Sequence, residues 1–181
     1  MGAQGTTFLQ RLAQAFERQA QTVSCESVAN HFLQRAQQEG RALTALQVNY
    51  LLYLAHGWHL AYFDRPLLKD LFWVWRYGVK PLGFYSSLVG HGSGGIVGAF
   101  RSGPRPYDYE FSPAIASEEM ALLNHVWETY ARYGGHELAR MCTLPDSPWA
   151  KAWKGQTEGS LSDQAIGAHF LAQRTRYVRS S

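Results

Sequence analysis

Two histidines on one apolar segment have a spacing that metal sites use. His56 and His59 lie three residues apart, so on a helix both imidazoles could reach one metal ion. A zinc site needs further ligands, and no other His or Cys shows ligand spacing with a second one. Two rings packed in the core, each with a satisfied hydrogen bond, therefore explain the pair better than a metal, and no cofactor is expected.

Residues 90–95, GHGSGG, have the glycine content of a phosphate-binding loop. The segment has no Lys followed by Ser or Thr, which such a loop requires. It is not a G-x-S-x-G nucleophile turn either, because His91 occupies the first glycine position. We predict a loop that becomes ordered on contact with a partner.

Cys142 and His136 could in principle supply a nucleophile and its base, since they lie six residues apart. A buried, inert thiol is the commoner role of a lone cysteine. A small hydrolase or transferase that uses His91, His136 or Cys142 in a loop-lined cleft is kept as the alternative function.

Helical periodicity organises the first third of the chain. Apolar residues at helical spacing predict an amphipathic helix over residues 7–21 and a second helix that begins at Ser24 or Ser27 and ends at Gly40. A third helix starts at Thr44. Its apolar residues cover more than half of the circumference, which is typical of a helix enclosed by its neighbours.

The middle of the chain changes character. The run LFWVW at residues 71–75 predicts a short strand, in which one of Trp73 and Trp75 is expected to face the core and the other the solvent. Gly78 and Pro81 predict a turn, and residues 82–89 a short helix. Residues 90–113 are rich in Gly and Pro and are expected to form a long loop or a weak hairpin.

The last third returns to helical patterns. Ser117 is the expected N-cap of a helix that ends at Gly134 and Gly135. A brief helix follows over 136–141, then a turn over 144–153, and Ser162 begins the final helix. The expected fold is mainly α, a single globular helical domain around a central apolar helix, with a short strand or hairpin and a long Gly/Pro-rich loop.

Composition narrows the classes of function. The chain has 181 residues, of which 46% are hydrophobic and 14% aromatic, enough for one domain with a real core. It has two cysteines and no run of about 20 apolar residues, and its start lacks a signal-peptide pattern, so we expect a cytoplasmic protein without a membrane span. The net charge of +3 is too small to favour nucleic-acid binding led by the C-terminal arginines.

The aromatic residues are the strongest functional signal. Trp, Tyr and Arg anchor protein interfaces, and this chain has more large rings than one modest core can hide. We therefore predict a non-enzymatic protein-binding surface and name its residues as Trp58, His59, Trp73, Trp75, Arg76, Tyr77, Lys80, Tyr85 and Trp149, with Arg101 and Arg105 as further flanking cations. Self-association into a homo-oligomer stays open.

Several fragments, in the right order, resemble the SocA-like (Panacea) antitoxin family over about residues 28–171. The shared elements are an L-L-Y triplet, G-W-H-L, W-x-Y-G with a following Tyr, S-P-W and a closing helix; they correspond to Leu51–Tyr53, Gly57–Leu60, Trp75, Tyr77, Gly78, Tyr85, Ser147–Trp149 and Ser162 with Ile166–Phe170. The chain departs from the family pattern at Tyr50, Val79, Lys80, Met141 and Cys142.

The resemblance implies a globular antitoxin that neutralises a toxin by direct binding. Some family members belong to mobile elements, so a prophage protein aimed at a host or phage target is a related expectation. The expected organisation is an N-terminal helical extension over 1–24, the Panacea-like domain over 25–173 and a basic tail over 174–181.

Overall fold

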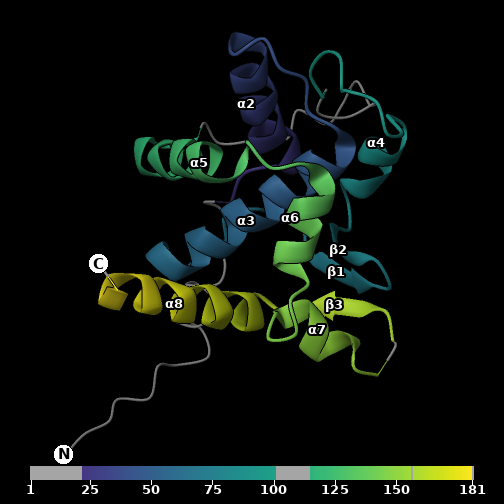
Figure 1. Cartoon of the computed structure of the whole chain (residues 1–181). Coiled ribbons are helices and arrows are strands. Elements are labelled where there is room, and N and C mark those ends of the chain that lie inside the picture. Colours follow the sequence, from purple (N-terminus) through teal and green to yellow (C-terminus); the bar gives the residue numbers. More distant parts are fainter. Residues whose placement is uncertain (1–21, 101–114, 156, 181) are drawn as a thin grey trace, which may run out of the picture.

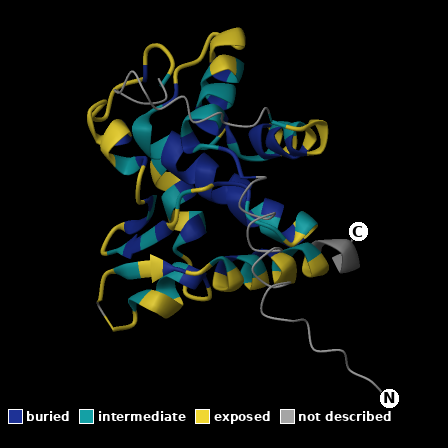
Figure 2. Cartoon of the chain, turned by 180° about the vertical axis from the view of Figure 1, so that it is seen from behind, coloured by how far each residue is buried: buried dark blue, intermediate teal, exposed yellow. Residues whose placement is uncertain are grey.

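Helix α3 (Ala45–Phe63) runs diagonally between the other elements of the computed structural model, which describes residues 22–100, 115–155 and 157–180 (Figure 1). It contacts α2, α4, α5, α6, α8 and β2, and twelve of its 19 residues are buried. The buried residues seen from behind in Figure 2 gather along this helix. A reciprocal capping box begins it: Gln47 N–H donates to Thr44 Oγ1, and Thr44 N–H donates to Gln47 Oε1.

The described residues form six further helices, of which all but α7 contact α3. They are α2 (Cys25–Gln38), α4 (Tyr85–Val89), α5 (Ser117–Tyr130), α6 (Gly135–Cys142), α7 (Pro148–Trp153) and α8 (Asp163–Ser180). In Figure 1, α8 crosses below α3, and α2 and α5 lie above it. None of the helices in the described ranges has the length and apolar character needed to cross a bilayer.

A three-stranded antiparallel sheet lies at one side of α3. Its order is β2-β1-β3, with β1 (Phe72–Trp75), β2 (Gly78–Pro81) and β3 (Gly159–Leu161). The strand β1 was expected from the sequence, but residues 78–81, predicted as a turn, form strand β2, which pairs with β1. The third strand was not expected, because three residues with a single apolar side chain give no readable alternation.

The expectation for Trp73 and Trp75 was wrong. Both side chains are half-buried, whereas Phe72, which precedes Trp73, and Val74, which lies between the two tryptophans, are buried. The physical reason is the two-residue period of a strand, which places residues 73 and 75 on the same face. Both indoles therefore lie on the face of the hairpin that is turned away from the core, together with Lys80, which pairs with Trp73.

The predicted starts of helices α2, α3 and α8 are confirmed. Ser24 Oγ accepts from Ser27 N–H, Thr44 caps α3, and Ser162 Oγ accepts from Ala165 N–H at 3.2 Å. Gly40, with a φ of 66°, follows the end of α2 as expected. The final helix continues to Ser180, so residues 174–180 form its last turns.

Three other boundaries were wrong. The N-cap of α5 is Ala116, not Ser117, because the Glu119 carboxylate accepts from Ala116 N–H. Gly134 and Gly135 begin α6 and do not end α5, which stops at Tyr130; here Glu137 accepts from Gly134 N–H. Residues 148–153, predicted as a turn, are helical because Ser147 caps them and Pro148 suits the first turn.

The Gly-rich segment is partly described. Residues 90–100 are irregular, and Ile96 N–H donates to Leu43 O at 2.8 Å, which holds the segment against the residues that precede α3. The side chain of Ile96 is buried. The rest of the predicted loop, the flanking Arg101 and Arg105, and the helix predicted over 7–21 lie outside the described residues.

Candidate functional site

Five of the predicted binding residues come together on the β1–β2 hairpin and the start of α4. This hairpin cluster consists of Trp75, Arg76, Tyr77, Lys80 and Tyr85. The Trp75 ring makes edge contacts with Tyr77 and Tyr85, at centroid distances of 5.0 and 5.6 Å. Tyr77 is 60% exposed, and Trp75 and Tyr85 are half-buried, so the rings form a surface that solvent reaches.

Two cations lie on these rings. Lys80 Nζ is 4.4 Å from the Trp75 centroid and 4.6 Å from that of Tyr85. The Arg76 guanidinium lies 4.4 Å from the Tyr77 centroid and donates to the Tyr77 hydroxyl. In the described part of the chain no carboxylate pairs with Lys80 or Arg76. The cluster thus combines large apolar rings with positive charge open to an acidic group.

Trp149 supports the cluster from α7. Its Nε1–H donates to the carbonyl oxygen of Trp75 at 2.8 Å, and its ring stacks on Trp153. The S-P-W triplet explains the position: Ser147 caps the helix, Pro148 begins it, and Trp149 then reaches the hairpin. Trp149 therefore holds the backbone of the hairpin at Trp75, and its half-buried ring lies beside the hairpin cluster.

A glycine is required where the hairpin turns toward α3. Tyr50 donates its hydroxyl to Tyr77 O at 3.3 Å. A Cβ on Gly78, whose φ is +130°, would lie 2.2 Å from that hydroxyl oxygen. The W-x-Y-G element thus fixes the hairpin against α3 through close backbone approach.

Two predicted residues do not belong to this surface. His59 is wrong as a partner contact because its side chain is fully buried. Trp58 is half-buried on α3 at another part of the fold: its Nε1–H donates to the Tyr130 hydroxyl at 3.0 Å, and its ring meets Phe170 edge-on. Trp73 lies on the same strand face as Trp75, two residues before it.

His56 and His59 each serve a separate polar contact. Leu68 N–H donates to His56 Nδ1, so Nε2 carries the ring proton and donates it to Asp163 at 3.0 Å. His59 Nδ1–H donates to Arg65 O at 2.7 Å. Among the described residues, no three His, Cys, Asp or Glu side chains are arranged to hold a metal ion.

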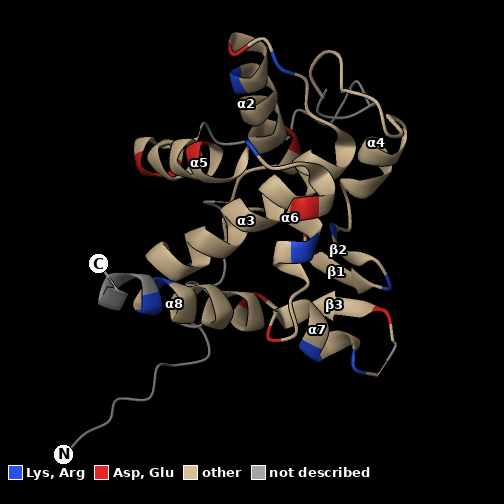
Figure 3. Ribbon diagram, viewed as in Figure 1, with Lys and Arg blue, Asp and Glu red and all other residues tan. Residues whose placement is uncertain are grey.

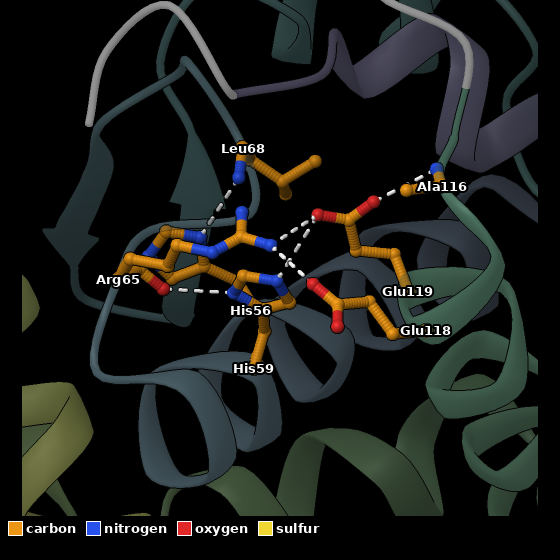
Figure 4. A network of polar contacts seen from close by, with 7 residues as sticks. All are labelled: His56, His59, Arg65, Leu68, Ala116, Glu118 and Glu119. Carbon is orange, nitrogen blue, oxygen red and sulfur yellow. Dashed lines mark hydrogen bonds and ion pairs between the residues drawn. The ribbon is translucent and has the colours of Figure 1, made fainter. Parts of the chain in front are cut away.

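Around His59 an ionic network joins the segment after α3 to the start of α5 (Figure 4). Arg65 donates to Glu119 Oε1 at 2.7 Å and to Glu118 Oε1 at 3.0 Å. Burial alone would raise the pKa of Glu119, but hydrogen bonds from Arg65 and Ala116 N–H hold it below its usual value. No spacing in the sequence pairs Glu119 with Arg65, so this network was missed.

The buried His59 makes stability depend on pH. Burial, together with the nearby Arg65 charge, lowers the pKa of His59. The unfolded ring takes up its proton near pH 6.5, so below that pH the unfolded chain binds more protons and the free energy of unfolding falls. Burial also lowers the pKa of His31 and His169, which add to this fall.

We expect His59→Asn to remove part of this pH dependence of the free energy of unfolding, because an amide does not take up a proton in this range. The amide can still donate to Arg65 O, so the local structure should be kept. The measurement is urea unfolding between pH 7.5 and pH 5 for the wild type and the variant. His125→Asn, at an exposed position of α5, is the control and should leave the curve unchanged. Equal slopes in the wild type and His59→Asn would contradict the assignment.

The residues of the enzymatic alternative are not assembled. His91 and His136 are exposed, on the segment after α4 and in the first turn of α6. Cys142 is buried at the end of α6, and burial raises the pKa of its thiol, which keeps it protonated. In Figure 3 the Lys and Arg segments are scattered over several helices and the hairpin, not joined in the stripe that nucleic acid favours.

Comparison with known proteins gives one match. The family model described as antitoxin SocA-like, Panacea domain, matches residues 48–150, more than half of the chain. Neither the curated proteins nor the solved structures contain a significant match. The matched range includes most of α3, the whole β1–β2 hairpin and the S-P-W triplet. The chain therefore belongs to the SocA-like antitoxin family and carries its Panacea domain.

Proposed function

We propose that this protein works as an antitoxin that binds a partner protein directly, and that the hairpin cluster is its main contact surface. The observation that carries the proposal is the cluster itself: three rings and two cations, gathered on one hairpin, with the Tyr77 ring 60% exposed. Trp, Tyr and Arg are the residue types that dominate the energy of protein interfaces.

The charges favour a partner with acidic groups near an apolar contact. Lys80 and Arg76 lie over rings, and apart from the bond that Arg76 donates to the Tyr77 hydroxyl, their N–H groups are available to a partner's carboxylate. A charge-assisted hydrogen bond between rings that exclude water is stronger than one in open solvent. The toxin encoded beside this gene is the proposed partner, and a host or phage protein is the variant of the proposal for a prophage-encoded chain.

The test combines growth rescue with binding. The chain is co-expressed with the product of the adjoining gene, and the complex is isolated and its Kd measured. Tyr77→Ser with Lys80→Glu should weaken binding by about tenfold or more, since hot-spot residues contribute about 1.4 kcal/mol and upward each. Growth rescue should fall in parallel.

The matched control is Tyr62→Ser with Lys151→Glu. Tyr62 is 50% exposed and Lys151 is exposed, but they lie on α3 and α7, outside the cluster. This control should bind as the wild type does. Thermal unfolding of both double variants shows that each remains folded. If the hairpin variant binds within twofold of the wild type, the surface is wrong; if no neighbouring product binds the wild-type chain, the antitoxin role is wrong.

A further inference from the structure

Two side chains from outside the β1–β2 hairpin donate hydrogen bonds to its strands. Trp149 of α7 donates its Nε1–H to Trp75 O, on β1, at 2.8 Å. Asn49 of α3 donates its Nδ2–H to Val79 O, on β2, at 2.9 Å. Each strand of the hairpin is therefore tied to a different helix by a side chain that does not belong to the sheet.

A third bond reaches the turn between the strands. Tyr50, which follows Asn49 on α3, donates its hydroxyl to Tyr77 O at 3.3 Å, the longest of the three contacts. The Tyr77 ring is 60% exposed, whereas Asn49 is 5% and Tyr50 1% exposed. A partner bound to the exposed ring would therefore touch almost nothing of the two α3 side chains that hold the backbone of the hairpin.

The hairpin depends on such attachments. Strands β1 and β2 have four residues each, and a hairpin of two short strands is marginally stable in water by itself. Strand β2 lies at the edge of the sheet, where it pairs with β1 and contacts α3. The bond from Asn49 therefore gives a second attachment to the strand that carries Lys80.

We infer that Trp149 and Asn49 are positioning residues, which hold the hairpin cluster in its binding geometry before the partner arrives. The inference rests on the proposed function, because it concerns how the same surface is kept ready for its partner. A surface that already has its bound arrangement loses less conformational entropy on association. When just a fraction of the molecules has that arrangement, the apparent affinity falls by the same fraction. The two donors thus contribute to binding through the hairpin, without contact between their own side chains and the partner.

The first measurement uses the whole chain without a partner. Trp149→Phe keeps a ring at this position and removes the N–H donor, so the hairpin should open more often. Amide hydrogen exchange of residues 73–80 should become about fivefold faster, the factor expected for the loss of one net hydrogen bond, while the amides of α5 keep their rates.

The matched control is Trp153→Phe. This half-buried indole stacks on Trp149 from the same helix, and it donates no bond to the described hairpin. The control should leave the exchange of the hairpin amides unchanged. Exchange in Trp149→Phe within twofold of the wild type, or equal acceleration in Trp153→Phe, would overturn the role of Trp149.

A second variant tests Asn49 through the direction of its bond. Asn49→Asp has nearly the same volume, but an ionised carboxylate places an acceptor against Val79 O, so the hairpin amides should exchange at least about fivefold faster than in the wild type at about pH 8. Burial raises the pKa of such a carboxyl, and the protonated acid can donate again. The difference from the wild type should therefore shrink at about pH 5. A difference that is absent or does not depend on pH would contradict the positioning role of Asn49.

Binding kinetics then connect the hairpin to the partner. With the product of the adjoining gene, Trp149→Phe should lower kon about fivefold and keep koff within about twofold of the wild type, because fewer molecules are ready to bind. Tyr77→Ser, which removes a contact, should act mainly on koff. If Trp149→Phe raises koff and leaves kon unchanged, the indole is a partner contact and the inference is wrong.

The measurements also separate this inference from the proposed function. If the hairpin loosens in both variants but no neighbouring gene product binds the wild-type chain, the positioning residues stand and the antitoxin role is wrong. If the wild-type chain binds that product while hairpin exchange is unchanged in both variants, the antitoxin role stands and the positioning residues are wrong.

Discussion

Replacing Arg65 with alanine is expected to reduce the free energy of unfolding by about 3 kcal/mol, because it leaves a buried carboxylate without its cation. The Glu119 side chain is 5% exposed, and Arg65 donates to it at 2.7 Å. After the substitution, Glu119 would keep only the hydrogen bond from Ala116 N–H and its contact with the neutral, buried His59. Chemical unfolding at pH 7 measures the loss.

A pH series tests the cause of this loss. In the wild type the lowered pKa of Glu119 gives stability that is present above about pH 4.5 and lost as pH falls through the lower folded value. In Arg65→Ala, burial without the guanidinium should raise that pKa, so protonation relieves the unpaired charge. The difference between the two proteins should therefore shrink between pH 7 and pH 4.

Two comparisons control this prediction. Glu118→Ala removes the exposed partner of the same guanidinium and should cost less than about 1 kcal/mol. The double variant Arg65→Leu with Glu119→Leu should recover much of the stability, because it leaves no buried charge. A pH-independent loss in Arg65→Ala, or an equal loss in Glu118→Ala, would contradict the assignment.

Replacing Gly57 with alanine is expected to destabilise the protein by about 2 kcal/mol. A Cβ at this position would lie 2.3–2.6 Å from three carbons of the Phe170 ring, which packs on α3 from α8. Overpacking costs about 1–3 kcal/mol, and contacts this short call for the upper end of that range. Alanine gains roughly 1 kcal/mol over glycine in a helix, which leaves a net loss of about 2 kcal/mol. The ring also contacts Tyr53 and Trp58, so it has little room to move.

The control is a glycine on the opposite helix of the same crossing. A Cβ on Gly167 would lie 3.3 Å from Leu60 Cβ, which a small shift relieves, so Gly167→Ala should change stability by less than about 1 kcal/mol. Thermal and urea unfolding of both variants give the comparison. Equal effects at the two positions would show that helix propensity, and not the Phe170 contact, governs the result.

Much of the local structure could be read from the sequence. The hydroxyl caps at Ser24, Thr44 and Ser162 gave correct helix starts, because a cap is a local hydrogen bond between residues three apart. The wrong helix boundaries also come from local signals, because one residue pattern can suit two different ends of a helix. Gly134 and Gly135 suit the end of one helix as well as the start of another, and only the side chain of Glu137 decides for the start.

In the candidate site, too, some residues could be predicted from the sequence and others could not. Rings and cations at residues 75–85 were predicted to form a binding surface, and the structure gathers five of them. His59 was also predicted as a partner contact, but its side chain is buried next to Glu119, where α3 packs against the start of α5.

The sequence by itself determined that the chain is mainly helical, that a short strand lies within residues 71–75 and that aromatic residues are its strongest functional signal. These properties depend on the order of neighbouring residues. Only the tertiary structure decided that Arg65 meets Glu119, that Phe170 lies on Gly57 and that Trp149 donates to the backbone of Trp75. The reason is physical: each of these contacts joins residues from separate elements, and their distances are set by how helices and strands pack, which no local pattern encodes.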